Sequence, residues 1–564
     1  MKNYPLNKAP LYITFREMME DISKKYAEST AYSFRVKPSD AEPVRVSFAQ
    51  LGEDVRSLCT ALCERGLQSS HVALIGKLTY PWVCTYLSLL TIGAVLVPLD
   101  AEWTGEDLVD TMLRGDCDAL FCSTDVLKNK IDPVYKRKKL ALISELDGEE
   151  GDDVFSALLA EGRALREKGD RRYETTKVNP DSLSMLAFTS GTTGKGKGVM
   201  LTQTAILSDV WGGLSLLTLY KKTLALLPPH HTFGSNLNLV AHLMYGTEVY
   251  LSSGIRYLLR ELKEQKPQHM ALVPLFLESF QRKILEGIKE KKMEKDFARF
   301  VKLSNSLRKT GVDLRRKFFK GILDTFGGEL RLVVCGGAPL NQSLIEFFDN
   351  IGITVLNGYG ITECAPVLAV NRNLMQKVGS VGQSLPNDTI KILDPDEKGE
   401  GEICVKGPNV MLGYYKDEEA TDAAFDADGY FRTGDIGKLD SDGWLYITGR
   451  AKNIIILSNG KNVYPEEIEA AFASVPGIAE IVVYEGVSAR GNAHNTIVAE
   501  IFPTEEYLEK GTEAAHAHFH SYVQDYNRTA VPYKKVGLLK IRTEDFPKNT
   551  LRKIVRFKID RSIN

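Results

Sequence analysis

The sequence predicts an α/β fold: a large N-terminal domain of parallel-sheet α/β subdomains with a small β-rich subdomain, followed by a small α+β C-terminal domain. Three observations support this prediction. The chain has 564 residues, too many for one hydrophobic core, so two or more domains are expected. Helical and strand patterns alternate in the first half of the chain. Short strands separated by turn signals replace that alternation after residue 399.

The first half contains helices and buried strands in turn. An amphipathic helix is predicted over 48–62 and a second helix over 82–90. Segments 71–75 and 94–97 are short apolar runs that predict buried strands. Strands that alternate with helices in this way usually form parallel sheets covered by helices. The charged segment 145–170 lacks clear periodicity, so we expect a surface excursion there.

The second half predicts two smaller units. Segment 402–406 is typical of a short strand in a β-rich subdomain. A helix from Pro465 and a strand over 481–484 then predict a compact α+β unit. We therefore expect domains over 1–450 and 451–564.

Composition narrows the class of protein. The net charge is −2, which gives no general attraction to nucleic acid. The N-terminal segment has no apolar core of a signal peptide, and the apolar stretch 83–99 is interrupted by polar residues. The eight cysteines are dispersed without a CxxC pair, which favours free thiols in a reducing compartment. We expect a cytoplasmic enzyme, with peripheral contact at the inner membrane surface as an alternative.

A glycine- and hydroxyl-rich loop follows a short apolar strand at 186–188. Its glycines let backbone N–H groups approach an anion, and its hydroxyls add donors around phosphate oxygens. Lys195 and Lys197 add positive charge. A Walker A loop is disfavoured because Gly198 stands where Ser or Thr must hold magnesium. A plain Gly/Thr-rich hairpin is the other alternative. The six loop residues are Thr189, Ser190, Gly191, Thr192, Thr193 and Gly194.

The loop and six further motifs resemble the acyl-adenylate-forming (AMP-binding) enzyme superfamily. The resemblance extends from about residue 48 to 556, and the motifs occur in the order that the family shows. An extended segment before the third motif makes the chain most similar to the long-chain fatty acid–CoA ligase branch. The motifs are TSGTTGKGKGVMLT from Thr189, LPPHHTFG with His231, GGAPL from Gly336, YGITE from Tyr359, FRTGD from Phe431, GRAKN from Gly449 and PKNTLRK ending at Lys553.

The resemblance implies a role for each matching residue. It implies that Glu363 also holds magnesium and that Lys452 is the hinge. The implied catalytic residues are Lys553, Thr362, Glu363 and His231. The implied nucleotide- and cofactor-binding residues are Thr189, Ser190, Gly191, Thr192, Thr193, Gly194, Lys197, Gly337, Ala338, Pro339, Gly358, Tyr359, Gly360, Asp435, Arg450 and Gly460.

These residue types suit the implied chemistry. Glu363 offers a hard oxygen ligand to magnesium, and Asp435 follows a glycine turn from which it can accept both ribose hydroxyls. Arg450 keeps its charge and can bind ribose or phosphate, while Lys553 would stabilise charge that develops at the α-phosphate. Three of these residues also have an ordinary alternative. Glu363 could be a solvated glutamate, Asp435 could belong to an ordinary tight turn, and Lys553 could lie in a solvated basic segment.

The resemblance further implies that the C-terminal domain is mobile and rotates about Lys452 between two half-reactions. Rotation would withdraw Lys553 and bring Gly460 towards the active site, where a residue without Cβ permits close approach of pantetheine.

The sequence departs from the family pattern at two positions. Gly196 replaces the usual proline, which predicts a more flexible loop, and Arg552 replaces the common glycine before Lys553. His230 precedes His231, so either histidine could be the one that faces the acid.

Segment 281–320 carries 14 Lys/Arg against 5 Asp/Glu, with apolar residues at roughly helical spacing. A basic amphipathic element of this kind could contact an anionic membrane surface or steer anionic ATP and CoA. A helix pair packed on the domain with a solvated basic face is the alternative.

The resemblance implies a ligase that uses ATP, Mg2+ and coenzyme A to convert a carboxylic acid, of medium or long chain, to acyl-AMP and then acyl-CoA. Transfer to an acyl carrier protein, or activation of an aryl or other acid, remains an alternative. No fused carrier domain and no nucleic-acid partner are expected. A nucleotide-binding regulator that has lost catalysis and an ATP-hydrolysing motor are the non-ligase alternatives.

Overall fold

The computed structural model describes residues 4–135, 140–189, 196–457, 462–472, 475–488, 493–548 and 554–563. Internal contacts divide the described chain into two compact units. Unit 1 holds the chain up to Thr389 together with Val405–Phe431, and unit 2 holds Ile390–Cys404 and Arg432–Asn564. The predicted domain boundary at residue 450 lies next to the implied hinge, Lys452, and this boundary stays a prediction.

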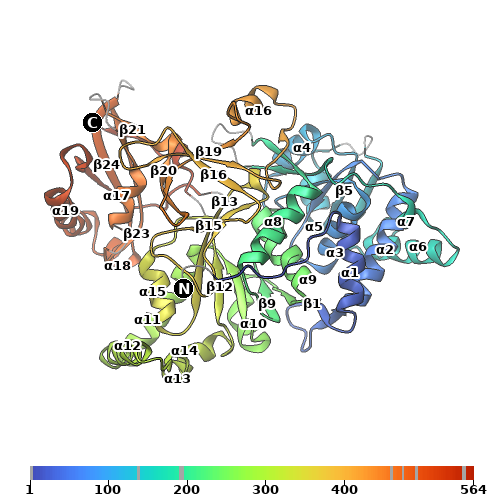
Figure 1. The fold of residues 1–564 in the computed structure, drawn as a ribbon, viewed down its shortest axis with the longest axis horizontal. Coiled ribbons are helices and arrows are strands. Elements are labelled where there is room, and N and C mark those ends of the chain that lie inside the picture. Colours follow the sequence, from blue (N-terminus) through green and yellow to red (C-terminus); the bar gives the residue numbers. More distant parts are fainter. Residues whose placement is uncertain are drawn as a thin grey trace. The chain divides into compact units, whose positions relative to one another are not determined.

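The first sheet of unit 1 has the strand order β18-β8-β7-β4-β3-β5-β6 (Figure 1). Strands β3 to β7 run parallel, whereas β8 pairs antiparallel with both β7 and β18. The predicted strands at 71–75 and 94–97 are confirmed as β3 and β4. The strands are β3 (His71–Ile75), β4 (Val95–Leu99), β5 (Ala119–Cys122), β6 (Leu142–Glu145), β7 (Leu183–Phe188), β8 (Gly198–Thr202) and β18 (Gly413–Tyr414).

The second group of strands in unit 1 has the order β15-β14-β13-β12-β11-β9-β10-β1-β2. The strands from β13 to β1 in this order are parallel, whereas β2 and β14 pair antiparallel with their neighbours. They are β1 (Thr30–Phe34), β2 (Val44–Ser47), β9 (Lys222–Ala225), β10 (Glu248–Leu251), β11 (His269–Leu272), β12 (Leu332–Cys335), β13 (Thr354–Gly360), β14 (Val367–Val370) and β15 (Gly382–Ser384).

The predicted parallel pairing is confirmed in the centre of each sheet, and antiparallel strands extend both sheets at their margins. β1–β2 and β7–β8 are joined by short connections, and a short connection can return only to an antiparallel neighbour. The alternation of helices and strands predicts the parallel centre of each sheet and not these added hairpins.

Several helices of unit 1 begin where the sequence supplies a side-chain cap. The N-cap of α2 is Ser47, whose side chain accepts a hydrogen bond from Gln50 N, and α3 ends at Gly93 with φ +81°. The longer helices are α1 (Phe15–Lys25), α2 (Phe48–Glu64), α3 (Tyr80–Ile92), α4 (Gly105–Arg114), α6 (Phe155–Glu167), α8 (Gln203–Leu216), α10 (Leu258–Gln265), α11 (Pro274–Glu290), α12 (Glu294–Lys309), α15 (Gln342–Asn350) and α16 (Glu418–Ala424). The short ones are α5 (Thr124–Val126), α7 (Arg172–Thr175), α9 (His242–Tyr245), α13 (Arg315–Phe318) and α14 (Lys320–Leu323).

Segment 145–170 is not a simple surface excursion, because it contains helix α6. Phe155, Leu158 and Gly162 are buried on this helix. A Cβ at Gly162 would lie 1.8 Å from the carbonyl oxygen of Ser57, so only glycine lets α6 approach α2 this closely. The many charges in the segment weakened its periodicity, since they occupy the outer face of α6.

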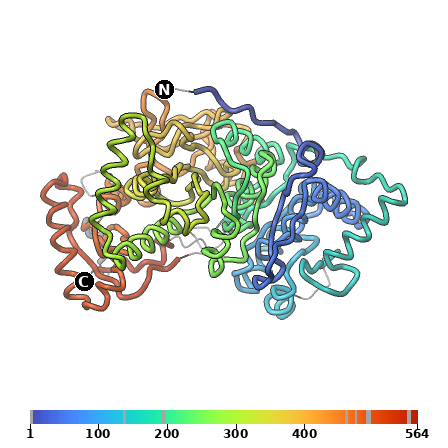
Figure 2. Tube along the Cα trace, turned by 90° about the horizontal axis from the view of Figure 1, so that it is seen from below, coloured from blue at the N-terminus to red at the C-terminus, as the bar shows by residue number. Residues whose placement is uncertain are grey.

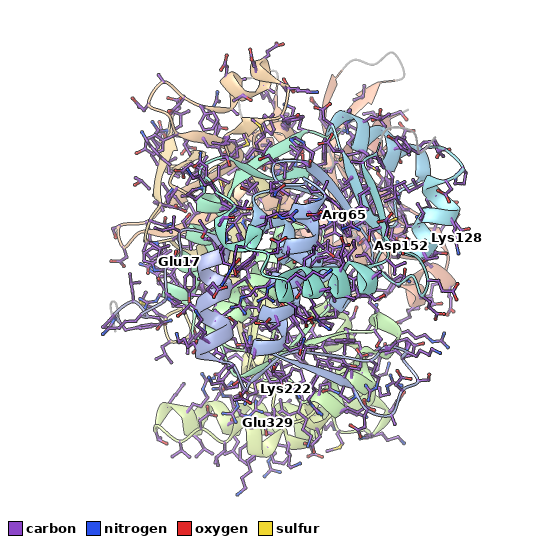
Figure 3. The ribbon with its side chains drawn as sticks, turned by 90° about the vertical axis from the view of Figure 1, so that its right-hand side faces the viewer. Glu17, Arg65, Lys128, Asp152, Lys222 and Glu329 are labelled. Carbon is purple, nitrogen blue, oxygen red and sulfur yellow. The ribbon has the colours of Figure 1, made fainter. Side chains whose placement is uncertain are left out.

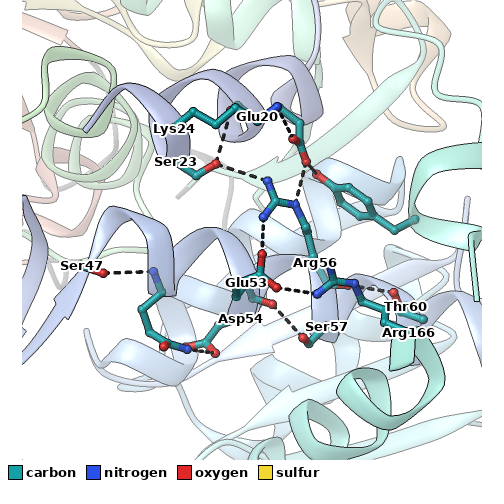
Figure 4. A network of polar contacts seen from close by, with 12 residues as sticks. Glu20, Ser23, Lys24, Ser47, Glu53, Asp54, Arg56, Ser57, Thr60 and Arg166 are labelled. Carbon is teal, nitrogen blue, oxygen red and sulfur yellow. Dashed lines mark hydrogen bonds and ion pairs between the residues drawn. The ribbon is translucent and has the colours of Figure 1, made fainter. Parts of the chain in front are cut away.

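Ion pairs join the N-terminal helices (Figure 4). Arg56 Nε lies 2.8 Å from Glu20 Oε1, and Arg56 Nη1 lies 2.6 Å from Glu53 Oε1. Arg166 Nη1 of α6 reaches Glu53 Oε2 at 2.8 Å. Burial raises the pKa of Glu20, but the Arg56 guanidinium outweighs burial and, with Tyr173, lowers that pKa to about 2. Further out, Arg65, which is labelled in Figure 3, places its Nη1 atom 2.6 Å from Glu161 Oε2. These pairs fix α6 on α2.

The N-terminal residues 4–13 run extended along unit 1 (dark blue in Figure 2). Buried Arg372 donates to the carbonyl oxygens of Tyr4 at 2.7 Å and Pro5 at 2.8 Å, and its guanidinium lies 3.5 Å from the centre of the Tyr4 ring. The Asn7 amide donates to Leu217 O at 2.8 Å at the end of α8. The N-terminal segment is thus pinned at two places.

Unit 2 contains the β-rich part and a four-stranded sheet of order β25-β24-β23-β26, with α17 and α19 in its core. The predicted strand at 402–406 and the helix from Pro465 are confirmed. The strands are β16 (Thr389–Leu393), β17 (Gly401–Lys406), β19 (Phe431–Leu439), β20 (Trp444–Arg450), β21 (Ile455–Ile456), β22 (Asn462–Val463), β23 (Ile478–Ser488), β24 (Ala493–Pro503), β25 (Leu538–Ile541) and β26 (Ser562–Ile563). The helices are α17 (Pro465–Phe472), α18 (Glu505–Glu509) and α19 (Thr512–Thr529). Across the described residues, no helix is long and apolar enough to span a bilayer.

Two histidines lie in the interior of unit 1. The rings of His242 and His269 are 4.9 Å apart, and both side chains are fully buried. Burial lowers the pKa of His242 to about 4 and also lowers the pKa of His269. Both are therefore neutral in the folded state at pH 7.

We expect acid to destabilise unit 1 through these histidines. An unfolded histidine binds a proton below about pH 6.5, whereas the buried ones stay neutral, so stability is lost as pH falls through that value. Each should contribute about 1.4 kcal/mol to the loss of unfolding free energy between pH 7.5 and 5.5. Urea unfolding of His269→Gln at both pH values should show a shallower dependence than the wild type. His516→Gln, at an exposed position on α19, is the control and should keep the wild-type dependence. An unchanged slope in His269→Gln would contradict this account.

Candidate functional site

A glycine-rich turn after β12 meets the glycine-rich end of the neighbouring parallel strand β13 in unit 1. Gly337, Ala338 and Pro339 form a turn directly after β12, and Gly337 adopts φ +82°, which favours glycine. A Cβ on Gly336 would lie 3.3 Å from the carbonyl oxygen of Gly358 at the end of β13. The sheet therefore brings the Gly336 turn against Gly358, Tyr359 and Gly360, as the resemblance implied. In α/β sheets, ligands bind at this edge.

The segment after β13 folds back to present Glu363. Ile361 N donates to Pro366 O at 2.8 Å, and a Cβ on Gly360 would lie 2.1 Å from the same carbonyl oxygen. Thr362 and Glu363 then form a short 3-10 turn. The Glu363 carbonyl oxygen accepts from Met411 N at 2.8 Å. Only glycine at 360 allows this tight return.

A tyrosine that the sequence reasoning missed links two predicted site residues. Tyr414 Oη donates to Glu363 Oε1 at 3.0 Å, and Lys197 Nζ lies 4.6 Å from the centre of the Tyr414 ring. Antiparallel pairing of β8 and β18 places Tyr414 opposite Val199. Burial and the Glu363 carboxylate raise the pKa of Tyr414, so its hydroxyl stays a donor. The sequence carried no signal for this contact beyond an aromatic pair after Gly413.

The predicted phosphate loop, residues 189–194, lies between β7 and β8, and the structure describes the residues on both sides of it. Thr189 N donates to Lys197 O at 3.0 Å, which closes the hairpin. The Gly196 carbonyl oxygen accepts from Arg114 Nη1 at 2.7 Å. A Cβ on Gly196 would lie 1.9 Å from Thr189 O, so this position excludes any side chain. Gly196, which was predicted to make the loop more flexible, is therefore also required by packing, because a side chain there would clash with Thr189 O. Ser190, Gly191, Thr192, Thr193 and Gly194 lie outside the described residues.

The two histidines of the second motif lie side by side in different surroundings. His230 Nε2 lies 3.5 Å from Asp100 Oδ2, and burial lowers the pKa of His230 to about 4. His231 begins the turn into the π-helix Phe233–Ala241, where its carbonyl oxygen accepts from Ser235 N at 2.9 Å. The two rings are 4.1 Å apart. His230 thus lies neutral beside Asp100 without a hydrogen bond between the two named atoms, and the role of His231 in facing an acid stays a prediction.

An apolar cavity of about 80 Å³ adjoins the Gly337 turn and the end of β13. Helix α8 contributes Val210, Gly213 and Leu214, the turn contributes Gly337, and β13 contributes Gly358. Asp209 also lines it, but its carboxyl accepts from Val367 N at 2.7 Å and burial raises its pKa. A mostly apolar hollow suits a hydrocarbon group.

A second set of predicted residues lies in unit 2. Antiparallel pairing of β19 and β20 places Asp435 opposite Arg450, and Arg450 Nε lies 2.7 Å from Asp435 Oδ1. Asp435 is buried, and Gly434 before it adopts φ +70°. The sequence motifs predict Asp435 and Arg450 as separate nucleotide-binding residues, whereas in the structure their side chains form an ion pair. Lys452 lies in a 3-10 turn directly after β20 and is exposed. Gly460 and Lys553 lie outside the described residues.

Glu363 fits the predicted magnesium site. Tyr414 occupies one carboxylate oxygen, and the other has no hydrogen-bond partner within the described chain. A free carboxylate oxygen beside glycine-rich strand ends is the hard ligand that Mg2+ prefers.

Together, the glycine-rich strand ends, the Lys197–Tyr414–Glu363 contacts and the apolar cavity define an α/β protein with a candidate ligand site in unit 1. A family model described as AMP-binding enzyme matches residues 19–415. The chain belongs to this AMP-binding enzyme family.

Individual relatives are consistent with that membership. Long-chain-fatty-acid–CoA ligase 6 of Rattus norvegicus is 31% identical over 443 residues, which is 72% of this chain and 62% of the relative. Long-chain-fatty-acid–CoA ligase FadD15 of Mycobacterium bovis is 28% identical over 491 residues, 84% of this chain and 80% of the relative. The matched chain thus spans less than two thirds of the rat protein.

Solved structures show the same fold. ATP-bound MatB from Rhodopseudomonas palustris matches with a TM-score of 0.74 and 22% identity, over 96% of this chain and 97% of that one. A Mycobacterium tuberculosis fatty acyl CoA synthetase matches with a TM-score of 0.64 and 21% identity, over the same shares. The predicted α/β fold with a smaller C-terminal domain is confirmed.

Proposed function

We propose that this protein is an AMP-forming acid–thiol ligase that activates a medium- or long-chain fatty acid with ATP and transfers it to coenzyme A. One observation carries the proposal: the apolar cavity is lined by Gly337 and Gly358, which belong to the two segments that the family resemblance assigns to the nucleotide. A hydrocarbon chain held against α8 would then place its carboxylate beside the α-phosphate. The names of the rat and mycobacterial relatives support a fatty acid as substrate.

In the first proposed step, an oxygen of the substrate carboxylate attacks the α-phosphorus of ATP, and pyrophosphate leaves. Catalysis of this step depends mainly on holding the two anions in line, because positioning and charge stabilisation dominate such transfers. Lys197 would bind the leaving phosphates, and Tyr414 would keep Glu363 oriented. Mg2+ bound by Glu363 would neutralise phosphate charge. His231 would face the acid, and Lys553 would stabilise the charge that builds up at the α-phosphate.

In the second proposed step, the thiol sulfur attacks the acyl carbonyl carbon, and AMP leaves as the thiol proton is lost. Rotation about Lys452 would withdraw Lys553 and bring Gly460 to the site, as the resemblance implies. Asp435 and Arg450 would then hold the ribose from one rigid strand pair.

We also propose a cytoplasmic location and a peripheral membrane contact through residues 281–320, since fatty acids partition into bilayers.

Pyrophosphate release tests the proposal. Saturated acids of increasing chain length should each be assayed with ATP and Mg2+, with and without coenzyme A. We expect release with medium or long chains, and turnover that requires coenzyme A. Release that turns over only with an acyl carrier protein would identify the carrier as acceptor, and silence with every acid would overturn the proposal.

Chain-length preference should respond to Gly213 of α8. This residue lines the cavity, and a Cβ added to it would meet no atom within 4 Å. Gly213→Leu should therefore fill the hollow without strain, lowering kcat/KM for long acids at least about tenfold while sparing short ones. Gly287→Leu on α11 is the matched control, because that position is also open but lies outside the cavity. An equal loss for all chain lengths would show that the hollow does not hold the acyl chain.

A further inference from the structure

Helix α12 packs on unit 1 through one side only. Phe297 lies 5.3 Å from Phe319 and 6.1 Å from Phe347, measured between ring centres. On the same side, Asn305 donates to Asn350 at 2.8 Å and Arg308 pairs with Asp349 at 2.6 Å. Figure 1 shows α12 and α13 at the lower edge of the unit. The helix pair is therefore folded onto the domain, as one of the alternatives for segment 281–320 required.

The opposite side of α12 combines cations with exposed apolar groups. Residues on a helix are about 100° apart, so Lys295, Arg299, Lys302, Leu303 and Phe300 fall within an arc of roughly 160°. Leu303 is 46% exposed and Phe300 is 39% exposed, although the Phe300 ring lies 5.5 Å from Phe318. We name these five residues, with Met293 at 44% exposure before the helix, the α12 outer face.

The charges of the α12 outer face are not neutralised. Within the described chain, Lys295, Arg299 and Lys302 have no acidic group within 4 Å, in contrast to Arg308 and Arg315, which pair with Asp349. Asp296 is the acidic residue on this part of the helix, so the face keeps a net positive charge.

We infer that the α12 outer face rests on the surface of a bilayer that contains anionic phospholipids. Interfacial helices place Lys and Arg among lipid headgroups and insert neighbouring Phe, Leu or Met side chains into the acyl boundary. A face built only to stay solvated, or to steer ATP and coenzyme A, would not leave three large apolar side chains about two-fifths exposed among its cations. An acidic protein partner that recognised charge alone is less well matched, because it would not explain the exposed Met293, Phe300 and Leu303 side chains. The inference deepens the proposed membrane contact and does not depend on ligase activity.

Vesicle sedimentation of the full chain, without ATP or coenzyme A, tests the inference. Vesicles of phosphatidylcholine alone and of phosphatidylcholine with phosphatidylglycerol in equal amounts are the probes. The wild type should bind the mixed vesicles and not the neutral ones, and binding should weaken as salt rises. Lys295→Glu/Arg299→Glu/Lys302→Glu should lower the partition coefficient at least roughly tenfold.

Two further variants keep the test decisive. Lys128→Glu/Lys168→Glu/Lys263→Glu makes the same change in net charge at exposed positions elsewhere on unit 1 and should retain binding. Met293→Ser/Leu303→Ser should also weaken binding, because it removes the inserting groups and keeps the charge. Equal loss in both charge-reversal variants, or full binding by Met293→Ser/Leu303→Ser, would overturn the inference. Competition by soluble polyglutamate at equal charge would do so too, since it would show recognition of charge alone. Pyrophosphate release with a soluble medium-chain acid should be unchanged in all three variants, which separates this result from the proposed function.

Discussion

Replacing Glu363 with glutamine should lower the rate of pyrophosphate release by at least about 100-fold, which corresponds to roughly 3 kcal/mol of transition-state stabilisation. Glutamine keeps the size of the side chain and can still accept from Tyr414 Oη, which lies 3.0 Å from Glu363 Oε1. It removes the negative charge that the proposed magnesium site needs. The loss should therefore appear in kcat and should be only partly relieved by excess Mg2+.

Two variants calibrate the Glu363 result. Glu419→Gln removes an exposed carboxylate from α16 and should leave the rate unchanged. Tyr414→Phe keeps the ring near Lys197 but removes the donor to Glu363, so we expect a smaller loss of about tenfold. A wild-type rate in Glu363→Gln would show that this carboxylate is not the metal ligand.

Lys553→Ala should reduce adenylate formation by at least about 100-fold while leaving thioester formation from preformed acyl-adenylate near the wild-type rate. The resemblance places this lysine over the reacting carboxylate in the first step only, and rotation about Lys452 would remove it before the second. Single-turnover assays of each half-reaction measure the two rates separately. Lys558→Ala, at an exposed position in the same basic segment, is the matched control. Equal loss in both half-reactions would contradict a role confined to adenylation.

Local sequence patterns predicted much of the fold. The periodicity at 48–62, 71–75 and 82–90 identifies α2, β3 and α3 because each pattern depends only on which face of one element is buried. The same reasoning failed for 145–170, where the outward charges of α6 hid three buried positions. It also missed the antiparallel hairpin strands at the sheet margins, since periodicity does not report strand direction.

The candidate site was predicted unevenly for a related reason. Its motifs identify residues one segment at a time, so Glu363, Asp435 and Lys197 were found from the sequence. Their neighbours were not, because a contact such as Tyr414 with Glu363 joins positions 51 residues apart through the pairing of β8 with β18. The Asp435–Arg450 ion pair similarly follows from the register of β19 and β20.

The sequence by itself therefore determined the fold class, the family and the residue types that the proposed chemistry needs. The tertiary structure decided which of them touch: Tyr414 between Lys197 and Glu363, His230 against Asp100, and the apolar hollow beside Gly337 and Gly358. The physical reason is that secondary structure and turn motifs depend on neighbours in the chain, whereas strand register and side-chain packing are set by contacts between distant segments.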